Sequence, residues 1–256
     1  MSRSVGTLTD PNKPSAHTIR LLTLVETHDC SYLPKRQANS VFVDSNTPPN
    51  WQQYCQLSHL GFRRSGSHYY RPQCPSCDEC KSCRVRVFDI NLRSKRFKRI
   101  LAKSKHLQIN LAPATFSAEH YALYQKYIDA RHRDGDMYPP TKAQYKSFLV
   151  GTEPYNRFLE VRDQTHKLVS SSAIDFLDDG ISAVYTYYDP AIEKISPGTL
   201  AVLLLCEMAK SHELDYLYLG YWVKNSQKMH YKTQYRPLEI FNGDEWQLLD
   251  EEKAGN

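Results

Sequence analysis

The sequence predicts an α+β protein in two parts, a smaller cysteine-containing N-terminal domain over residues 18–110 and a larger C-terminal domain over residues 111–245. Two observations support this division. Cysteines are concentrated in the first part, whereas the second part alternates between helical and strand patterns of apolar residues. With 256 residues, 41% of them hydrophobic and 24% charged, the chain can bury a real core, which excludes whole-chain disorder and a coiled coil.

The N-terminal part contains short elements on both sides of its cysteine run. Residues 51–60 carry apolar side chains at helical spacing, and Gly61 follows as a helix C-cap. Residues 21–25 are an apolar run typical of a strand, and residues 62–71 resemble a hairpin that turns at Ser65 and Gly66. Beyond the cysteines, residues 84–90 alternate as a further strand.

The C-terminal part predicts helices and strands in a recognisable order. Ser117 can cap a helix over residues 117–132. After it we expect a helix over 143–150, strands over 158–162, 167–177 and 181–188, a helix over 198–212, a strand over 216–222, a short helix over 226–232 and a strand over 238–241. This order matches an acetyltransferase-like (GNAT-like) fold, in which a splayed strand pair opens a cleft for an acyl donor and an amine acceptor.

Cysteine usage indicates the compartment and suggests a metal site. The chain has seven cysteines, an odd number, and its N-terminus has no apolar signal segment, so we expect a reducing, cytoplasmic setting. Four cysteines in the run CPSCDECKSC lie too close together to pair as unstrained disulfides. Thiolate ligation of zinc or of an iron–sulfur cluster is the better interpretation, and reduced, structural or redox-reactive thiols are the alternative. The candidate ligands are Cys30, Cys74, Cys77, Cys80 and Cys83.

The formal net charge of +5 comes from one segment. Residues 90–118 contain no acidic side chain, and residues 93–105 contain seven basic ones: Arg93, Lys95, Arg96, Lys98, Arg99, Lys103 and Lys105. Without these seven, 26 basic and 28 acidic residues leave the rest of the chain at −2. Such a concentration of cations favours contact with a phosphate backbone, with an ordinary solvated surface as the alternative. No apolar run approaches the roughly 18 residues needed to span a bilayer, so we expect no membrane contact.

Five sequence blocks together resemble a known family. They are HDCSYLPKRQANSVF at 28–42, GFRRSGSHYYRPQCPSCDEC at 61–80, RHRDGDMYPP at 131–140, SAVYTYYDP at 182–190 and YLYLGYWVKNSQKMHYKTQYRPLE at 216–239. They closely resemble the bacterial leucyl-tRNA–protein transferases, also called aspartate/glutamate leucyltransferases, which are related to the eukaryotic arginyl-tRNA–protein transferases. The resemblance covers about residues 18–243.

The resemblance implies a specific activity. Such enzymes move leucine from leucyl-tRNA to the α-amine of proteins that begin with Asp or Glu, which marks those proteins for the bacterial N-degron pathway. The family's cysteines have been associated with an iron–sulfur cluster, which favours that group over zinc. Cys83 stands where the family often has an aliphatic residue, so it is the least secure ligand.

The loop before the long helix argues against coenzyme A as the acyl carrier. Acetyl-CoA-dependent enzymes of this fold bind the pyrophosphate on backbone amides of a glycine-rich loop. Here the loop reads EKISPGTL, with one glycine and a proline. We therefore expect no CoA, and a CoA-dependent acetyltransferase is the disfavoured interpretation.

Tyrosines and one aspartate are the catalytic candidates. A tyrosine can stack on the terminal adenine of a tRNA or donate a hydrogen bond to an ester oxygen, which suggests roles for Tyr187 and Tyr221 in catalysis and for Tyr185 in substrate binding. Asp189 follows the tyrosine strand and could accept the amine proton. The alternatives are core aromatics and a loop cap.

The remaining candidates would bind the two substrates. Lys228, Tyr231 and Lys232 have the spacing of one helix face and would meet the tRNA 3′ end, unless that face is simply solvated. An acceptor carboxylate requires a cation, and its α-ammonium requires an acid. The candidates for these roles are Arg131, Asp134 and Asp136, with Lys35 and Arg36 as alternatives to them and ordinary surface ion pairs as the competing explanation. Arginyl transfer by the same chemistry, or a non-catalytic RNA-binding metal module, remain the other functional interpretations.

Overall fold

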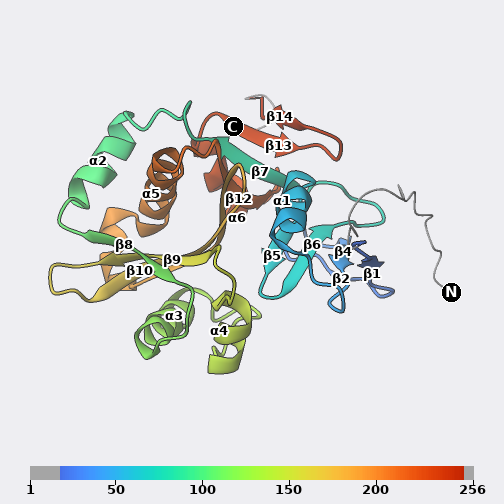
Figure 1. Ribbon diagram of the computed structural model, residues 1–256, viewed down its shortest axis with the longest axis horizontal. Helices are drawn as coiled ribbons and strands as arrows, with labels where there is room; N and C mark the ends of the chain where they lie inside the picture. Colours follow the sequence, from blue (N-terminus) through green and yellow to red (C-terminus); the bar gives the residue numbers. More distant parts are fainter. Residues whose placement is uncertain (1–17, 251–256) are drawn as a thin grey trace.

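The computed structural model describes residues 18–250, so the N-terminal segment in which no signal was expected lies outside the described residues (Figure 1). The N-terminal elements are β1 (Leu21–Thr23), β2 (His28–Asp29), β3 (Gln37–Ala38), β4 (Ser40–Val43), α1 (Trp51–His59), β5 (Arg63–Ser65), β6 (His68–Pro72), β7 (Lys81–Arg86) and α2 (Lys95–Lys103). The C-terminal elements are β8 (Gln108–Pro113), α3 (Ala118–Arg131), α4 (Lys142–Leu149), β9 (Asn156–Arg162), β10 (Leu168–Phe176), β11 (Gly180–Tyr188), η1 (Pro190–Ile195), α5 (Pro197–Ser211), β12 (Tyr216–Trp222), α6 (Gln227–His230), η2 (Tyr231–Gln234), β13 (Leu238–Phe241) and β14 (Trp246–Leu248).

An eight-stranded mixed sheet in the order β14-β13-β7-β12-β11-β10-β9-β8 forms the centre of the molecule. Within residues 18–250, β11 and β12 are the one parallel pair, and α5 is the crossover that connects them. Their pairing covers three positions, from Gly180 opposite Tyr216 to Ser182 opposite Tyr218. Beyond these positions the two strands separate, and this opening between them is called the fork below.

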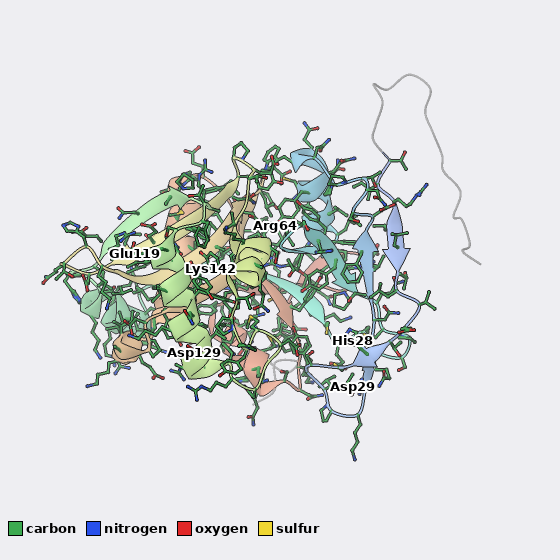
Figure 2. All side chains as sticks on the ribbon, turned by 90° about the horizontal axis from the view of Figure 1, so that it is seen from below. His28, Asp29, Arg64, Glu119, Asp129 and Lys142 are labelled. Atoms are coloured by element: carbon green, nitrogen blue, oxygen red, sulfur yellow. The ribbon has the colours of Figure 1, made fainter. Side chains whose placement is uncertain are left out.

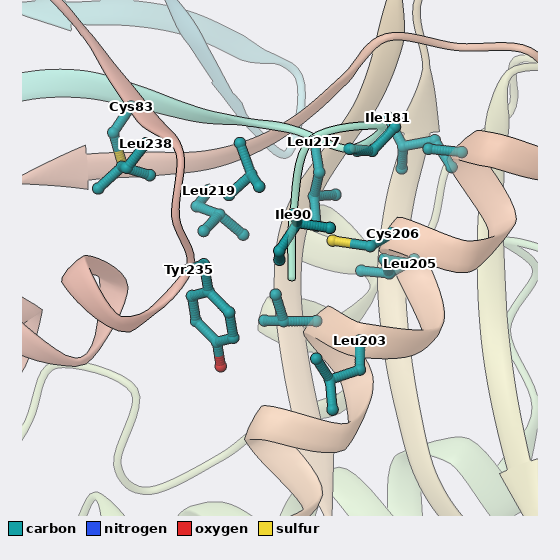
Figure 3. Packing of buried hydrophobic residues seen from close by; sticks show 14 of the residues in the cluster. Cys83, Ile90, Ile181, Leu203, Leu205, Cys206, Leu217, Leu219, Tyr235 and Leu238 are labelled. Carbon is teal, nitrogen blue, oxygen red and sulfur yellow. The ribbon is translucent and has the colours of Figure 1, made fainter. Parts of the chain in front are cut away.

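Helices cover both faces of the sheet. Figure 1 shows α2 and α5 on one face and α3 and α4 on the other. The first face buries a core under α5 in which Cys83, Cys206 and Leu203 are fully enclosed (Figure 3). Eight of the 15 residues of α5 are buried, which explains why its apolar run is continuous and does not alternate strongly with polar positions.

A four-stranded sheet in the order β1-β4-β6-β5 and helix α1 form a smaller N-terminal layer. The α1 helix begins at a capping box, in which the Asn50 side chain and the Gln53 side chain each bond the other's backbone. Its buried face packs with Leu177 and Tyr218 of the C-terminal part. The two parts therefore share a core.

Most predicted elements are confirmed, and the strands that were not predicted are β2, β3, β4, β8 and β14. Strand β8 was not predicted, and the expected domain boundary at residues 110/111 falls inside it. Strand β7 begins at Lys81 rather than at residue 84, because it pairs on one side with β12 and on the other with β13. The cationic segment forms α2, which Ser94 caps and which buries Phe97 and Ile100 beneath its basic face. No helix within residues 18–250 combines the length and the apolar character that a membrane crossing requires.

Candidate active site

Four of the five candidate cysteine ligands line one cavity. The cavity has a volume of about 680 Å³ and lies between the N-terminal strands and the sheet. Its wall includes Cys30, Cys74, Cys77 and Cys80, and Tyr221 faces it from β12. The structure thus brings Cys30 to the cysteine run from more than 40 residues earlier in the chain, as the sequence predicted.

The four thiols influence one another electrostatically. Burial raises the pKa of Cys80 to about 12, and the neighbouring Cys30, Cys74 and Cys77 add to the rise. Arg36 donates from Nη1 to the Cys77 sulfur at 3.2 Å, which would stabilise a thiolate there. These soft donors around one space fit a zinc ion or an iron–sulfur cluster. The sulfur atoms do not yet lie as close together as the ligands of a single ion would. Within residues 18–250, His59, Asp178 and Asp179 form the one group whose donor atoms all lie within 4.8 Å of one another. The thiols would therefore have to move closer to bind one metal ion.

Cys83 lies apart from the other candidate ligands. It is fully buried on β7 in the main core and does not line the cysteine cavity. Burial raises the pKa of its thiol, against the influence of Lys232 and Arg63. The structure therefore places the least secure of the predicted ligands in a packing position.

The fork between β11 and β12 holds two buried cations. Arg63 donates from Nη2 to the Ala183 carbonyl on β11, at 2.5 Å, and Lys232 donates to the Tyr221 carbonyl on β12. Each cation thus bonds a carbonyl on one of the separating strands. Between them Gly220 adopts a φ of +82°, at the bulge where β12 changes its register with β7.

Tyr221 is held rigidly at this fork. Its hydroxyl donates to the Tyr70 carbonyl at 3.0 Å, and the Gly61 carbonyl lies 3.1 Å away. Burial raises its pKa well above the ordinary tyrosine value. A neutral, fixed phenol faces the cysteine cavity, so Tyr221 is positioned between the cavity and the fork.

Tyr187 belongs to a buried polar chain rather than to an open surface. Its hydroxyl lies 2.8 Å from His120 Nδ1 and 3.1 Å from the Tyr145 hydroxyl, and His120 Nε2 lies 2.8 Å from Glu160. Tyr187 has no exposed surface, and burial raises its pKa. These contacts favour the core-aromatic alternative over a catalytic role for Tyr187.

Tyr185 shares a face with Tyr187, as the strand pattern predicted, but its environment differs. Its ring packs against Tyr124, Tyr127 and Phe148. Its buried hydroxyl has no hydrogen-bond partner within residues 18–250. A buried donor without a partner is costly, so the Tyr185 hydroxyl differs from that of Tyr187, whose hydrogen bonds are satisfied.

Asp189 is a cap and an ion-pair partner. Its carboxylate accepts from the Ala191 amide at 2.9 Å, and Lys126 and Lys167 lie 2.7 and 3.5 Å away. Burial works against ionisation, but the hydrogen bond from Lys126 and the amide hold the pKa of Asp189 below its ordinary value. A carboxylate so stabilised is a weak base, which favours the loop-capping alternative.

The predicted acceptor-binding residues lie at two separate places. Arg131 at the end of α3 pairs with Glu193, and the exposed Asp134 and Asp136 follow in the next loop. Lys35 and Arg36 are exposed beside the cysteine cavity, where Arg36 contacts Cys77. Figure 2 likewise separates His28 and Asp29 on the N-terminal strands from Asp129 on α3. The structure therefore leaves the two sets as alternative candidates for the acceptor site.

The cationic surface is confirmed as an exposed patch, but Lys232 does not share an exposed face with its neighbours. All seven basic residues of the 93–105 segment are exposed, and no ion pair to any of them occurs among the described residues. Lys228 and Tyr231 are exposed, whereas Lys232 is 4% exposed. The expected single helix breaks into α6 and the 3₁₀ turn η2 at Tyr231, which rotates Lys232 inward.

The comparisons with known proteins agree with this architecture. Family models described as Arginine-tRNA-protein transferase, N terminus, and Arginine-tRNA-protein transferase, C terminus, match residues 28–99 and 119–242. An aspartate/glutamate leucyltransferase of Marinobacter nauticus is 48% identical over 87% of this chain and 93% of its own length. Another aspartate/glutamate leucyltransferase, of Pseudomonas syringae pv. tomato, is 44% identical over 87% of this chain and 94% of its own length. A solved structure of L-PGS from Bacillus licheniformis, 12% identical over 56% of this chain and 47% of its own, has a TM-score of 0.42, too low to carry an argument. The chain belongs to the aspartate/glutamate leucyltransferase family.

Proposed function

We propose that this transferase moves leucine from leucyl-tRNA to the α-amine of proteins whose first residue is Asp or Glu, as a step of the N-degron pathway. The identity of 44–48% to aspartate/glutamate leucyltransferases over nearly their whole length carries this proposal. The fork between β11 and β12 is the proposed place of reaction.

The GNAT-like character of the fold is part of the proposal. Its support is the parallel β11–β12 pair, which α5 crosses and which separates after Ser182 and Tyr218. The loop before α5 lacks the glycine-rich pattern that grips CoA, so a nucleic-acid-borne acyl group is the donor that fits.

Direct aminolysis accounts for the chemistry. The acceptor nitrogen bonds to the ester carbonyl carbon, the bond from that carbon to the ribose oxygen breaks, and the amine proton ends on the released hydroxyl. The ester is already activated, so the enzyme mainly positions two ends and stabilises the developing oxyanion. The unpartnered Tyr185 hydroxyl is a donor available for that oxygen.

The donor's phosphates have an evident partner in the α2 surface. Its exposed cations would bind the tRNA backbone, and Lys228 and Tyr231 would meet the 3′ end. Leucyl-tRNA and acceptor proteins are thus the proposed partners. Since tRNA is cytoplasmic and none of the seven cysteines forms a disulfide, a cytoplasmic location belongs to the same proposal.

A zinc ion or an iron–sulfur cluster at Cys30, Cys74, Cys77 and Cys80 is a separate part of the proposal. When bound, it would cross-link the β2–β3 segment to the cysteine run and so fix the cavity wall. Anaerobic purification followed by iron, sulfide and zinc analysis tests it. Stoichiometric zinc alone would select zinc, and neither metal in stoichiometric amount would favour plain thiols.

A transfer assay tests the main proposal. Purified protein is incubated with labelled leucyl-tRNA and a peptide that begins with Asp, and the same peptide with an acetylated N-terminus is the matched control. We expect label only in the free-amine peptide. Absence of transfer, while a reference leucyltransferase works, would refute the proposal. Transfer from arginyl-tRNA would change the donor, and RNA binding without any transfer would favour a binding module.

A further inference from the structure

Buried charges in this protein are almost all balanced. Within residues 18–250 each buried carboxylate has a cation beside it: Asp44 with Arg20, Glu160 with Arg162, Asp175 with Arg64, and Asp189 with Lys126. The buried Arg84 likewise has Glu239 at 2.7 Å. Burying a charge costs several kcal/mol unless it is compensated, which explains the pattern.

Arg63 and Lys232 are the two exceptions. They are 7% and 4% exposed, and neither forms an ion pair with any described carboxylate. Each has one backbone carbonyl as its hydrogen-bond partner, although a guanidinium has five N–H donors and an ammonium three. Burial lowers the pKa of Lys232, as expected for a cation without an acid.

The adjacent arginine shows how unusual Arg63 is. Neighbouring residues on β5 point to opposite faces. Arg64, which is labelled in Figure 2, forms a bidentate pair with the buried Asp175 at 2.6 and 2.8 Å. Arg64 therefore has the partner of a structural arginine. Arg63, with equal burial, lacks one.

The two unpaired cations meet at one point in the fork. A methyl group added at Gly220 would lie 3.7 Å from Arg63 Nε and 3.8 Å from Lys232 Nζ. Their charged heads thus border the same small space, where β11 and β12 have ceased to pair.

We infer that Arg63 and Lys232 bind the side-chain carboxylate of the acceptor's N-terminal Asp or Glu. This inference rests on the proposed function. A planar guanidinium beside an ammonium suits a carboxylate, and both charged groups lie within 4 Å of one point beside Gly220, so a single carboxylate could contact the two together. In the proposed function, the exposed cations of α2 bind the phosphates of the tRNA. The acceptor's side-chain carboxylate is the remaining anionic group that needs a cationic partner.

Acceptor specificity tests the inference. Steady-state transfer is measured with peptides that differ only in a first residue of Asp or Asn, for the wild type, Arg63→Gln, Arg63→Lys and Lys232→Met. Removing either cation should lower kcat/KM for the Asp peptide about 100-fold and change the value for the Asn peptide less than about 3-fold. Arg63→Lys should lose about 10-fold, because the charge remains but the planar fork is lost.

Lys224→Met is the matched control, since it removes an exposed cation from the loop after β12. It should leave both peptides unaffected. Circular dichroism and thermal unfolding check that each variant folds. If Arg63→Gln does not fold, Arg63→Lys and Lys232→Met together still test the inference. Equal losses on both peptides, or a raised KM for leucyl-tRNA with an intact Asp preference, would overturn the inference and assign the site to a donor phosphate.

Peptide binding without tRNA separates this inference from the proposed function. Calorimetry should show tighter binding of the Asp peptide than of the Asn peptide, and Lys232→Met should abolish the difference. A wild type that shows this preference but transfers no leucine would refute the proposed function and keep the carboxylate site. A wild type that transfers leucine but binds both peptides equally would refute the site alone.

Discussion

The basic face of α2 should make donor binding strongly dependent on salt. We consider the double variant Lys98→Gln/Arg99→Gln, which removes two exposed cations that have no ion pair in the described structure. Each cation that neutralises a phosphate contributes about 0.7–0.9 to the slope of log affinity against log salt. The double variant should therefore reduce that slope by about 1.4–1.8.

This slope converts into a simple comparison of two salt concentrations. The ratio of leucyl-tRNA affinities, wild type over double variant, should fall by about 10-fold when salt is raised from 50 to 200 mM, because the slopes differ by about 1.6. Fluorescence anisotropy with labelled leucyl-tRNA measures it. Stability should stay within about 0.5 kcal/mol, because both side chains are exposed.

A matched variant decides whether the position or the charge matters. Lys142→Gln/Lys146→Gln removes two exposed cations from α4, on the opposite face of the sheet, and should leave the slope unchanged. Equal effects of the two double variants would mean that net charge alone attracts the tRNA. An unchanged slope in the α2 variant would refute the proposal that α2 contacts phosphates.

Three further predictions concern stability and pH. Arg64→Met should cost about 3–5 kcal/mol in urea unfolding, because it leaves the fully buried Asp175 without its cation; a loss below about 1 kcal/mol would contradict this. Tyr187→Phe should cost about 1–2 kcal/mol through the lost bond to His120 and should leave kcat within about 3-fold; a 100-fold fall in kcat would instead make it catalytic. Since the folded pKa of Asp189 is lowered, its stabilisation is present above the unfolded value of about 3.9 and disappears as pH falls below it. The stability difference between the wild type and Asp189→Asn should therefore shrink between pH 7 and pH 3, and a constant difference would refute the ion-pair account.

The pattern of apolar residues predicted most of the buried elements and missed the exposed strand β8 together with several short strands. Helix α3 buries Leu123, Tyr124 and Ile128 at the helical spacing that the sequence displays. Strand β10 does not alternate, because eight of its nine residues are buried, and it was recognised by its short length and by the turn residues that follow it. Strand β8 is an edge strand whose residues are all exposed or half-buried, so it carries no apolar alternation to detect.

The site was less predictable because its meaning depends on distant partners. Nothing local distinguishes Arg63 from Arg64; the difference is that Asp175, 111 residues later, lies on the face of one and not of the other. The expectation that Lys232 shares an exposed helix face with Lys228 was wrong for a different reason. Its spacing from Lys228 assumes a continuous α-helix, and the change to a 3₁₀ turn at Tyr231 alters which side chain faces inward.

The two sets of cations suit two different recognition tasks. A tRNA backbone presents many equivalent charges over a long surface, so exposed cations that salt screens over about 10 Å give attraction without demanding one geometry. A single carboxylate at the end of a protein offers one charge, and it must be told from the amide of Asn, which has nearly the same shape. A buried site discriminates strongly between the two, because water cannot compensate the cations there. An Asn amide in the site would leave both buried cations without a negative charge, whereas an Asp carboxylate would compensate them. The fork supplies this condition, since separating strands leave carbonyls that hold Arg63 and Lys232 in place without neutralising them.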